Sequence, residues 1–240
     1  MNRSRFTEKP GTIISLGTVR RGLRKFRALR GILNFKIQQR RHGVQIGERP
    51  WLDDASGETF LRMITDARGY LEYGSGGSTV LAARLNKAFI SVDTDQFYLK
   101  EVRKKVGDLA PNQHLEYVNI GWTTEWGYPV FSSPSTFNRK RWKSYVQAPW
   151  HFVDKSELPD LVMIDGRFRV AAALTSCVHL SGSHNSRILV DDYIKRPHYH
   201  VIETYAQLVE ICGRMAIFKP PLALPAGIRE AIDQYIVDCR

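Results

Sequence analysis

Strands and helices are expected to alternate along most of this chain, and the alternation restricts the fold more than any other feature. Apolar or β-branched runs predict strands, and amphipathic stretches predict helices. The predicted strands cover 70–73, 88–92, 115–120, 160–164 and 187–190, and the predicted helices cover 96–106, 168–180 and 199–212. This order predicts an α/β fold with a doubly wound, mostly parallel sheet, whose ligands bind beyond the carboxyl ends of the strands.

The sequence predicts several further helices and strands before, within and after this alternating region. After Pro50, Ser56 is predicted to cap a helix that carries Phe60 and Ile64. A short helix is expected over 80–85, and a later run at 215–218 suggests a sixth strand. A closing helix is expected over 228–237, after a proline-rich turn.

The positive charge of the chain is confined to one end. Residues 1–45 hold 12 Lys and Arg residues and one acid, Glu8, so they carry the whole formal net charge of +11. Apolar residues recur there at steps of three or four, which predicts a basic amphipathic helical arm ahead of a domain at 46–240. The arm fits an anionic membrane surface or RNA, and packing of its apolar stripe on the domain is the alternative.

Composition also bears on the compartment. No run is long and apolar enough to span a membrane. The three cysteines, Cys177, Cys212 and Cys239, are odd in number and lack the close spacing of a zinc site. We therefore expect a cytoplasmic protein, with peripheral attachment to a membrane as the alternative. The sequence does not indicate an oligomeric state.

A glycine-rich loop follows the first predicted strand. Residues 70–79 read Tyr-Leu-Glu-Tyr-Gly-Ser-Gly-Gly-Ser-Thr, a strand that enters a loop and then a helix. Glycines let backbone N–H groups approach a ligand, and the helix N-terminus favours negative charge. The next strand ends at Asp93, about 20 residues on, where a carboxylate can accept both hydroxyls of a ribose. Together these features point to a nucleoside ligand.

The residues that follow four of the predicted strands resemble those of one enzyme family. Gly74-Ser75-Gly76 after Glu72, Asp93 after Val92, Ile164-Asp165-Gly166, and Asp191-Asp192 together look like a class I S-adenosylmethionine-dependent methyltransferase. The resemblance covers about residues 56–195. It implies a Rossmann-like methyltransferase fold in which Gly74, Ser75 and Gly76 pass under the methionine portion of the cofactor. It also implies that Glu72 lies near the cofactor's amino group, that Asp93 binds its ribose and that Asp165 lines its pocket. Ser78 stands where a third glycine is usual, which keeps NAD as an alternative.

Three carboxylates are expected at one edge of the sheet. Asp165, Asp191 and Asp192 follow adjacent strands, and at close range they repel unless a cation neutralises them. The set resembles the metal-dependent O-methyltransferases related to catechol methyltransferase, which implies a Mg²⁺ ion that lowers the pKa of the acceptor hydroxyl. Without a metal, Asp165 lines the cofactor pocket and His198 or His200 is the candidate general base. The candidate catalytic residues are therefore Asp165, His198 and His200.

Two further features concern the methyl acceptor. Arg167 and Arg169 follow Asp165 and either clamp an anionic substrate or pair with the nearby acids. Residues 122–152 form a long insertion that holds nine of the chain's 26 aromatic residues, interleaved with Arg and Lys. These rings either stack on a planar or sugar ring of the acceptor or pack the insertion onto the sheet.

The sequence therefore predicts a methyltransferase that uses S-adenosylmethionine, with an oxygen of a small molecule or glycan as its acceptor. One alternative enzyme is a metal-dependent glycosyltransferase that uses Asp93 and Asp95 as a carboxylate pair. A non-catalytic binding module on a methyltransferase fold is the third possibility.

Overall fold

A computed structural model of the protein describes residues 31, 37, 39, 41 and 43–240. Most of the predicted arm at 1–45 lies outside these residues. Within the described part of the chain, no helix is both long enough and apolar enough to cross a membrane.

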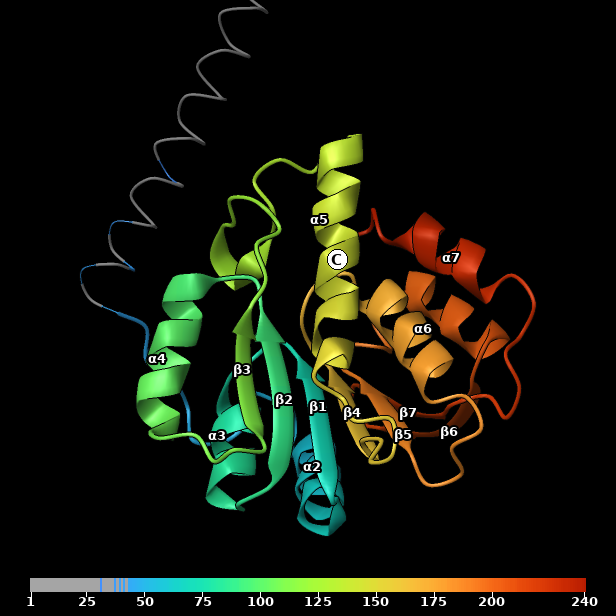
Figure 1. Ribbon diagram of the computed structural model, residues 1–240, viewed down its shortest axis with the longest axis horizontal. Helices are drawn as coiled ribbons and strands as arrows, with labels where there is room; N and C mark the ends of the chain where they lie inside the picture. Colours follow the sequence, from blue (N-terminus) through green and yellow to red (C-terminus); the bar gives the residue numbers. More distant parts are fainter. Residues whose placement is uncertain (1–30, 32–36, 38, 40, 42) are drawn as a thin grey trace, which may run out of the picture.

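A single sheet of seven strands forms the centre of the described chain (Figure 1). The strand order is β3-β2-β1-β4-β5-β7-β6. The first five strands are parallel, and β7 is antiparallel to both of its neighbours. The predicted α/β Rossmann-like fold is therefore confirmed. The strands are β1 (Gly69–Tyr73), β2 (Ala88–Asp93), β3 (Gln113–Tyr117), β4 (Leu161–Ile164), β5 (Arg187–Val190), β6 (Gln207–Cys212) and β7 (Met215–Lys219).

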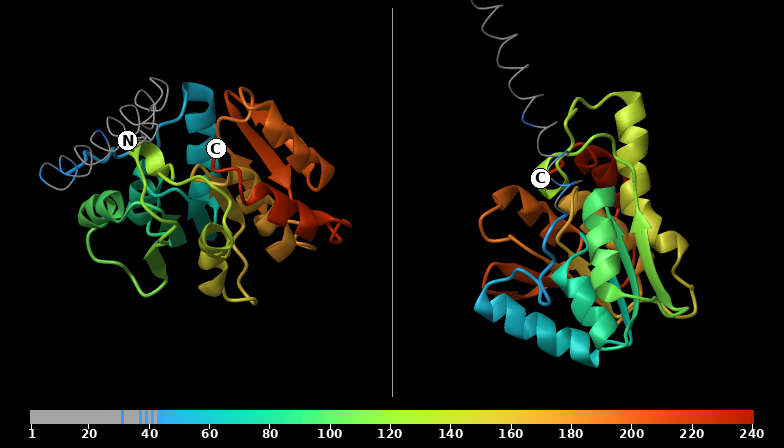
Figure 2. Two further views of the ribbon diagram at one scale, coloured as in Figure 1. Left: turned by 90° about the horizontal axis from the view of Figure 1, so that it is seen from above. Right: turned by 90° about the vertical axis from the view of Figure 1, so that its left-hand side faces the viewer.

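Helices pack on both faces of the sheet (Figures 1 and 2). Side chains alternate along β1, so Tyr70 joins one core while Leu71 and Tyr73 join the other. One face carries α2 (Asp54–Asp66), α3 (Gly77–Arg84) and α4 (Gln96–Val106), and the other carries α5 (Thr136–Gln147), α6 (Arg169–His179) and α7 (Ile228–Tyr235). Three 3₁₀ helices complete the elements: η1 (Glu125–Gly127), η2 (Ala148–His151) and η3 (Pro197–Thr204).

Two local expectations were wrong. The predicted helix at 199–212 is instead η3 followed by β6, which pairs with β7 through a turn at Gly213, where φ is +56°. β-branched residues such as Val209 and Ile211 favour this strand over a helix. Ser56 does not cap α2, because Asp53 is the N-cap and accepts a hydrogen bond from the Ser56 backbone N–H.

The order of the strands reverses between β1 and β4, the place where a doubly wound sheet binds its ligand. Gly74 leaves β1 here with φ of +97°. A Cβ on Gly74 would lie 2.8 Å from the Gly166 nitrogen and 2.9 Å from the Asp165 carbonyl carbon. The ends of β1 and β4 therefore approach too closely for any side chain at this position.

We predict that Gly74→Ala lowers the free energy of unfolding by about 2–5 kcal/mol, from backbone strain plus the shift of a neighbouring backbone. Gly227→Ala is the control, since Gly227 also has positive φ (+77°) but its added Cβ meets only an ordinary contact at 3.9 Å. This control should lose about 1–2 kcal/mol. Urea unfolding measures both values, and equal losses would refute the close approach of β1 and β4.

Candidate functional site

The buried carboxylate of Glu72 accepts hydrogen bonds from residues on both sides of the glycine loop that joins β1 to α3. Glu72 accepts hydrogen bonds from the Tyr70 hydroxyl at 2.8 Å, from the Ser78 hydroxyl at 2.6 Å and from the Thr79 hydroxyl. Burial raises the pKa of Glu72, and these hydroxyl groups oppose the rise. Hydroxyls from β1 and from the first turn of α3 thus satisfy Glu72. In this position Glu72 ties the start of α3 to β1, on either side of the glycine loop.

Asp93 lies at the end of β2, beside the glycine loop. Its carboxylate accepts the backbone N–H groups of Ser75 at 3.1 Å and of Asp95 at 2.8 Å. Burial raises the pKa of Asp93 to about 7, against the lowering effect of those N–H groups. Carboxylate oxygens have about four lone-pair sites, so Asp93 keeps acceptor capacity for a ligand.

Asp95 has a different role from Asp93. Its carboxylate caps α4 by accepting the backbone N–H groups of Phe97 at 2.9 Å and Tyr98 at 3.2 Å. It also accepts from the Gln39 side chain at 3.1 Å. An N-cap with these partners does not fit the carboxylate pair of a metal-dependent glycosyltransferase.

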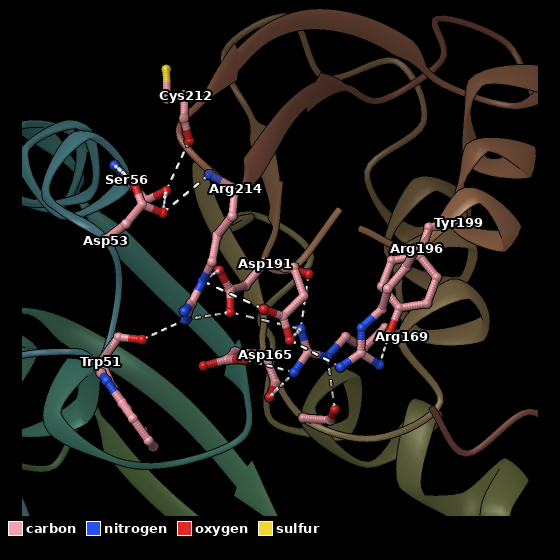
Figure 3. Close-up of polar contacts among 12 residues, drawn as sticks. Trp51, Asp53, Ser56, Asp165, Arg169, Asp191, Arg196, Tyr199, Cys212 and Arg214 are labelled. Atoms are coloured by element: carbon pink, nitrogen blue, oxygen red, sulfur yellow. Dashed lines mark hydrogen bonds and ion pairs between the residues drawn. The ribbon is translucent and has the colours of Figure 1, made fainter. Parts of the chain in front are cut away.

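Asp165, Asp191 and Asp192 do converge at the edge of the sheet, as the sequence predicted. Three arginines surround them, and we call the six residues the Asp-Arg cluster (Figure 3). The buried Arg169 lies 2.8 Å from Asp165, 3.3 Å from Asp192 and 3.8 Å from Asp191. Arg196 pairs with Asp192 at 3.0 Å, and Arg214 contacts both Asp191 oxygens at 2.8 and 2.9 Å.

This pairing does not fit the predicted Mg²⁺ site. Guanidinium groups already neutralise all three carboxylates, and the described residues contain no group of three side chains that could hold a metal ion. Mutual repulsion, the reason for expecting a cation, is therefore relieved by Arg169, Arg196 and Arg214. Asp165 stays partly accessible, with 37% of its side chain exposed.

Arg214 was not predicted as a site residue. It comes from the β6–β7 turn, a region that the sequence analysis assigned to a helix and a separate strand. Besides Asp191, it donates to the Trp51 carbonyl at 2.5 Å, and its backbone N–H donates to Asp53 at 3.1 Å. Gly213 between two apolar runs is the hairpin signal that would have revealed this turn.

The two candidate histidines have no contact with the glycine loop, Asp93 or Asp165 among those found in the described chain. His198 lies 3.8 Å from Asp238 near the C-terminus, and burial lowers its pKa. His200 is exposed and stacks on Tyr193 at 4.9 Å. Asp165 is the candidate base that lies where the strand order reverses.

The linker before α2 and the insertion meet above the strand ends. The Arg49 carbonyl lies so close to α3 that a Cβ on Gly77 would overlap it. Trp51 stacks on Trp126 of the insertion, with ring centroids 5.1 Å apart. A stack of two mostly exposed rings therefore joins the linker to the insertion.

Some aromatic residues of the insertion pack it onto the sheet, which is one of the two predicted roles. Trp142, Tyr145 and Trp150 are buried in the core. Others are exposed, and a cavity of about 350 Å³ lies among them beside Arg141, which stacks over Phe137 at 4.2 Å. Trp122, Phe131 and Phe137 supply its aromatic walls.

One solved structure has a similar fold. The chain is similar to the solved structure of a methyltransferase-like protein from Silicibacter pomeroyi, with 29% identity and a TM-score of 0.67 over 80% of this chain and 100% of that one. A cofactor-bound protein from MTB matches at 16% identity and a TM-score of 0.44 over 89% of this chain and 99% of that one, which is too distant to support a conclusion. No protein-family model and no curated protein matches the chain. The first likeness supports a methyltransferase fold.

We predict that Asp191→Asn lowers the free energy of unfolding by about 2–4 kcal/mol, because Arg214 loses the carboxylate that it contacts through both oxygens and Arg169 loses one of its three carboxylates. Asp233→Asn is the control, since Asp233 forms an exposed pair with Lys143 at 2.8 Å. It should cost less than about 1 kcal/mol. EDTA should leave the wild-type melting temperature unchanged. If Asp191→Asn stabilised the protein, the carboxylates would be repelling one another and the pairing would be wrong.

Proposed function

We propose that this protein is an S-adenosylmethionine-dependent methyltransferase that acts on an oxygen of a small molecule or glycan. The observation that carries the proposal is the glycine loop at the reversal of the strand order, with the Asp93 carboxylate beside it. The likeness to a methyltransferase-like protein supports it.

The residues at the strand ends fit the cofactor. Gly74, Ser75 and Gly76 would lie beneath its methionine portion, and Asp93 would accept its ribose hydroxyls. Gly76 has an extended backbone with φ of 170°, a conformation that any residue can adopt. We therefore attribute the glycine at this position to the space that a bound cofactor would occupy beside it. When bound, S-adenosylmethionine supplies a methyl group attached to a positively charged sulfur.

Asp165 is the group that we propose as the general base. Its partial burial raises its pKa to about 7, Arg169 opposes this rise, and Asp191 and Asp192 add to it. A carboxylate with a pKa near neutrality accepts a proton more readily than an ordinary aspartate. Asp165 would take the proton of the acceptor hydroxyl, which leaves the oxygen free to attack the methyl group.

Calorimetry tests the proposed cofactor. The wild type should bind S-adenosylhomocysteine, and NAD or UDP should give no comparable heat. Gly76→Val should weaken that binding at least tenfold, because the side chain fills the space of the close approach, while the cooperative melt persists. Gly57→Val, in α2 with nothing within 4 Å of its Cβ, is the control and should bind normally. Equal affinities for all ligands, or for both variants, would refute this cofactor.

The pKa of Asp93 gives a pH test. An ionised carboxylate accepts both ribose hydroxyls, so S-adenosylhomocysteine should bind about tenfold more tightly at pH 8 than at pH 6. Asp93→Asn should bind more weakly and lose this dependence on pH. Isothermal titration at the two pH values measures both effects, and an unchanged dependence in the variant would assign it to another group.

The ligand-free protein should show the opposite trend in stability. The folded pKa of Asp93 lies above its usual value near 4, so the folded state binds the proton more tightly than the unfolded state. Asp93 therefore favours folding most at pH below 4, and this contribution is lost as pH rises to 7. Asp93→Asn should flatten that part of the profile of unfolding free energy against pH. A profile as steep as that of the wild type would mean that Asp93 is not the group responsible.

A further inference from the structure

Arg167 differs from every arginine of the Asp-Arg cluster. It follows Gly166 at the end of β4 and is only 5% exposed. Its Nη1 donates to the Cys239 carbonyl at 3.4 Å, and its Nε has no hydrogen-bond partner. No carboxylate of the described chain pairs with it. The side chain stacks instead over the Tyr128 ring, with 4.0 Å from its Cζ atom to the ring centroid.

The charges at this edge of the sheet leave Arg167 uncompensated. Asp165, Asp191 and Asp192 supply at most three negative charges, and Arg169, Arg196 and Arg214 supply three positive charges in direct contact with them. Arg167 adds a fourth guanidinium. A guanidinium cannot lose its proton in a protein, so its charge persists despite burial. Burying a charge without a partner costs free energy, which an anionic ligand would recover.

We propose that Arg167 binds an anionic group, a carboxylate or phosphate, of the methyl acceptor. The proposal rests on the proposed function, since it names the class of acceptor for the same site. The planar fork of a guanidinium matches the geometry of both groups.

The neighbours of Arg167 place it on the acceptor side of the site. Its contacts are to Tyr128 of the insertion and to Cys239 near the C-terminus, whereas the proposed ribose ligand is Asp93 on β2. Burial tends to raise the pKa of Tyr128, but Arg167 and then Arg196 lower it below its usual value. The surroundings of Tyr128 are therefore positively charged.

The position of Arg167 along the chain also suits an acceptor. Arg167 follows Asp165 by two residues, at the same strand end. An acceptor whose anionic group binds Arg167 is therefore held at the strand end that carries the proposed base. Such an anchor raises the effective concentration of the acceptor hydroxyl near Asp165.

Stability of the ligand-free protein gives the first test, with Arg169 as the matched control. Arg167→Met should leave the melting temperature unchanged or raise it, because the variant removes a buried charge that lacks a partner. Arg169→Met should lower the melting temperature, because it leaves Asp165 without its arginine and removes one of the contacts of Asp191 and Asp192. A fall in Arg167→Met as large as that in Arg169→Met would overturn the proposal, since Arg167 would then have a structural partner.

Anion binding gives the second test. The probes are malonate and inorganic phosphate, added to the protein saturated with S-adenosylhomocysteine at constant ionic strength. Both probes should raise the wild-type melting temperature, and Arg167→Gln should weaken their binding about 10- to 100-fold, the range for lost hydrogen bonds to a charged group. Equal responses of wild type and variant would overturn the proposal.

Cofactor binding shows whether the anionic group that binds Arg167 belongs to the methyl acceptor or to the amino-acid portion of the cofactor. Arg167→Gln should bind S-adenosylhomocysteine and 5′-methylthioadenosine, which lacks the amino-acid carboxylate, as the wild type does. A loss confined to S-adenosylhomocysteine would assign Arg167 to the cofactor and overturn its assignment to the acceptor. If the wild type bound neither nucleoside, the proposed function would fail. The shift in melting temperature that malonate and phosphate cause in the ligand-free wild type and in Arg167→Gln would still test whether Arg167 binds an anion.

Discussion

The buried guanidinium of Arg169 holds together the part of the sheet on which the site depends. Besides the carboxylates of the Asp-Arg cluster, it donates to the Gly166 carbonyl at 3.1 Å, the Asp165 carbonyl at 3.2 Å and the Asp191 carbonyl at 2.8 Å. One side chain thus fixes the ends of β4 and β5 relative to each other. Arg214 extends the connection from Asp191 to the Trp51 carbonyl and to Asp53, the residue that caps α2.

The carboxylates at the ends of β1 and β2 are paired with neutral hydrogen-bond donors and not with arginines of the described chain. At β1 and β2 hydroxyl and N–H groups satisfy the carboxylates: Ser78 and Thr79 bind Glu72, and Ser75 binds Asp93. No arginine among the described residues pairs with Asp93, and burial raises its pKa to about 7. The same edge of the sheet therefore offers a carboxylate suited to sugar hydroxyls on one side and a positively charged region around Arg167 on the other. Such a division fits two ligands that differ in charge.

Much of this site was predictable because it follows from local sequence. The strand, the glycine loop and Asp93 are read from a continuous stretch, and parallel strands necessarily bring Asp165 and Asp191 to the same edge. The partners of those acids were not predictable in the same way. Arg169 was left with two possible roles, and only the packed structure separates it from Arg167. Arg214 was missed because an antiparallel hairpin, which begins in a segment with apolar residues at helical spacing, brings it back across the sheet. The arm at 1–45 and its membrane or RNA partner remain predictions.

A crystal structure of the protein with S-adenosylhomocysteine would test the central claim most directly. The account predicts the ribose hydroxyls on the Asp93 carboxylate, the homocysteine portion over Gly74 to Gly76, and the sulfur facing Asp165. Arg167 would remain free of the cofactor's carboxylate. A nucleoside bound elsewhere, or one whose ribose avoids Asp93 while the glycine loop stays empty, would contradict the account.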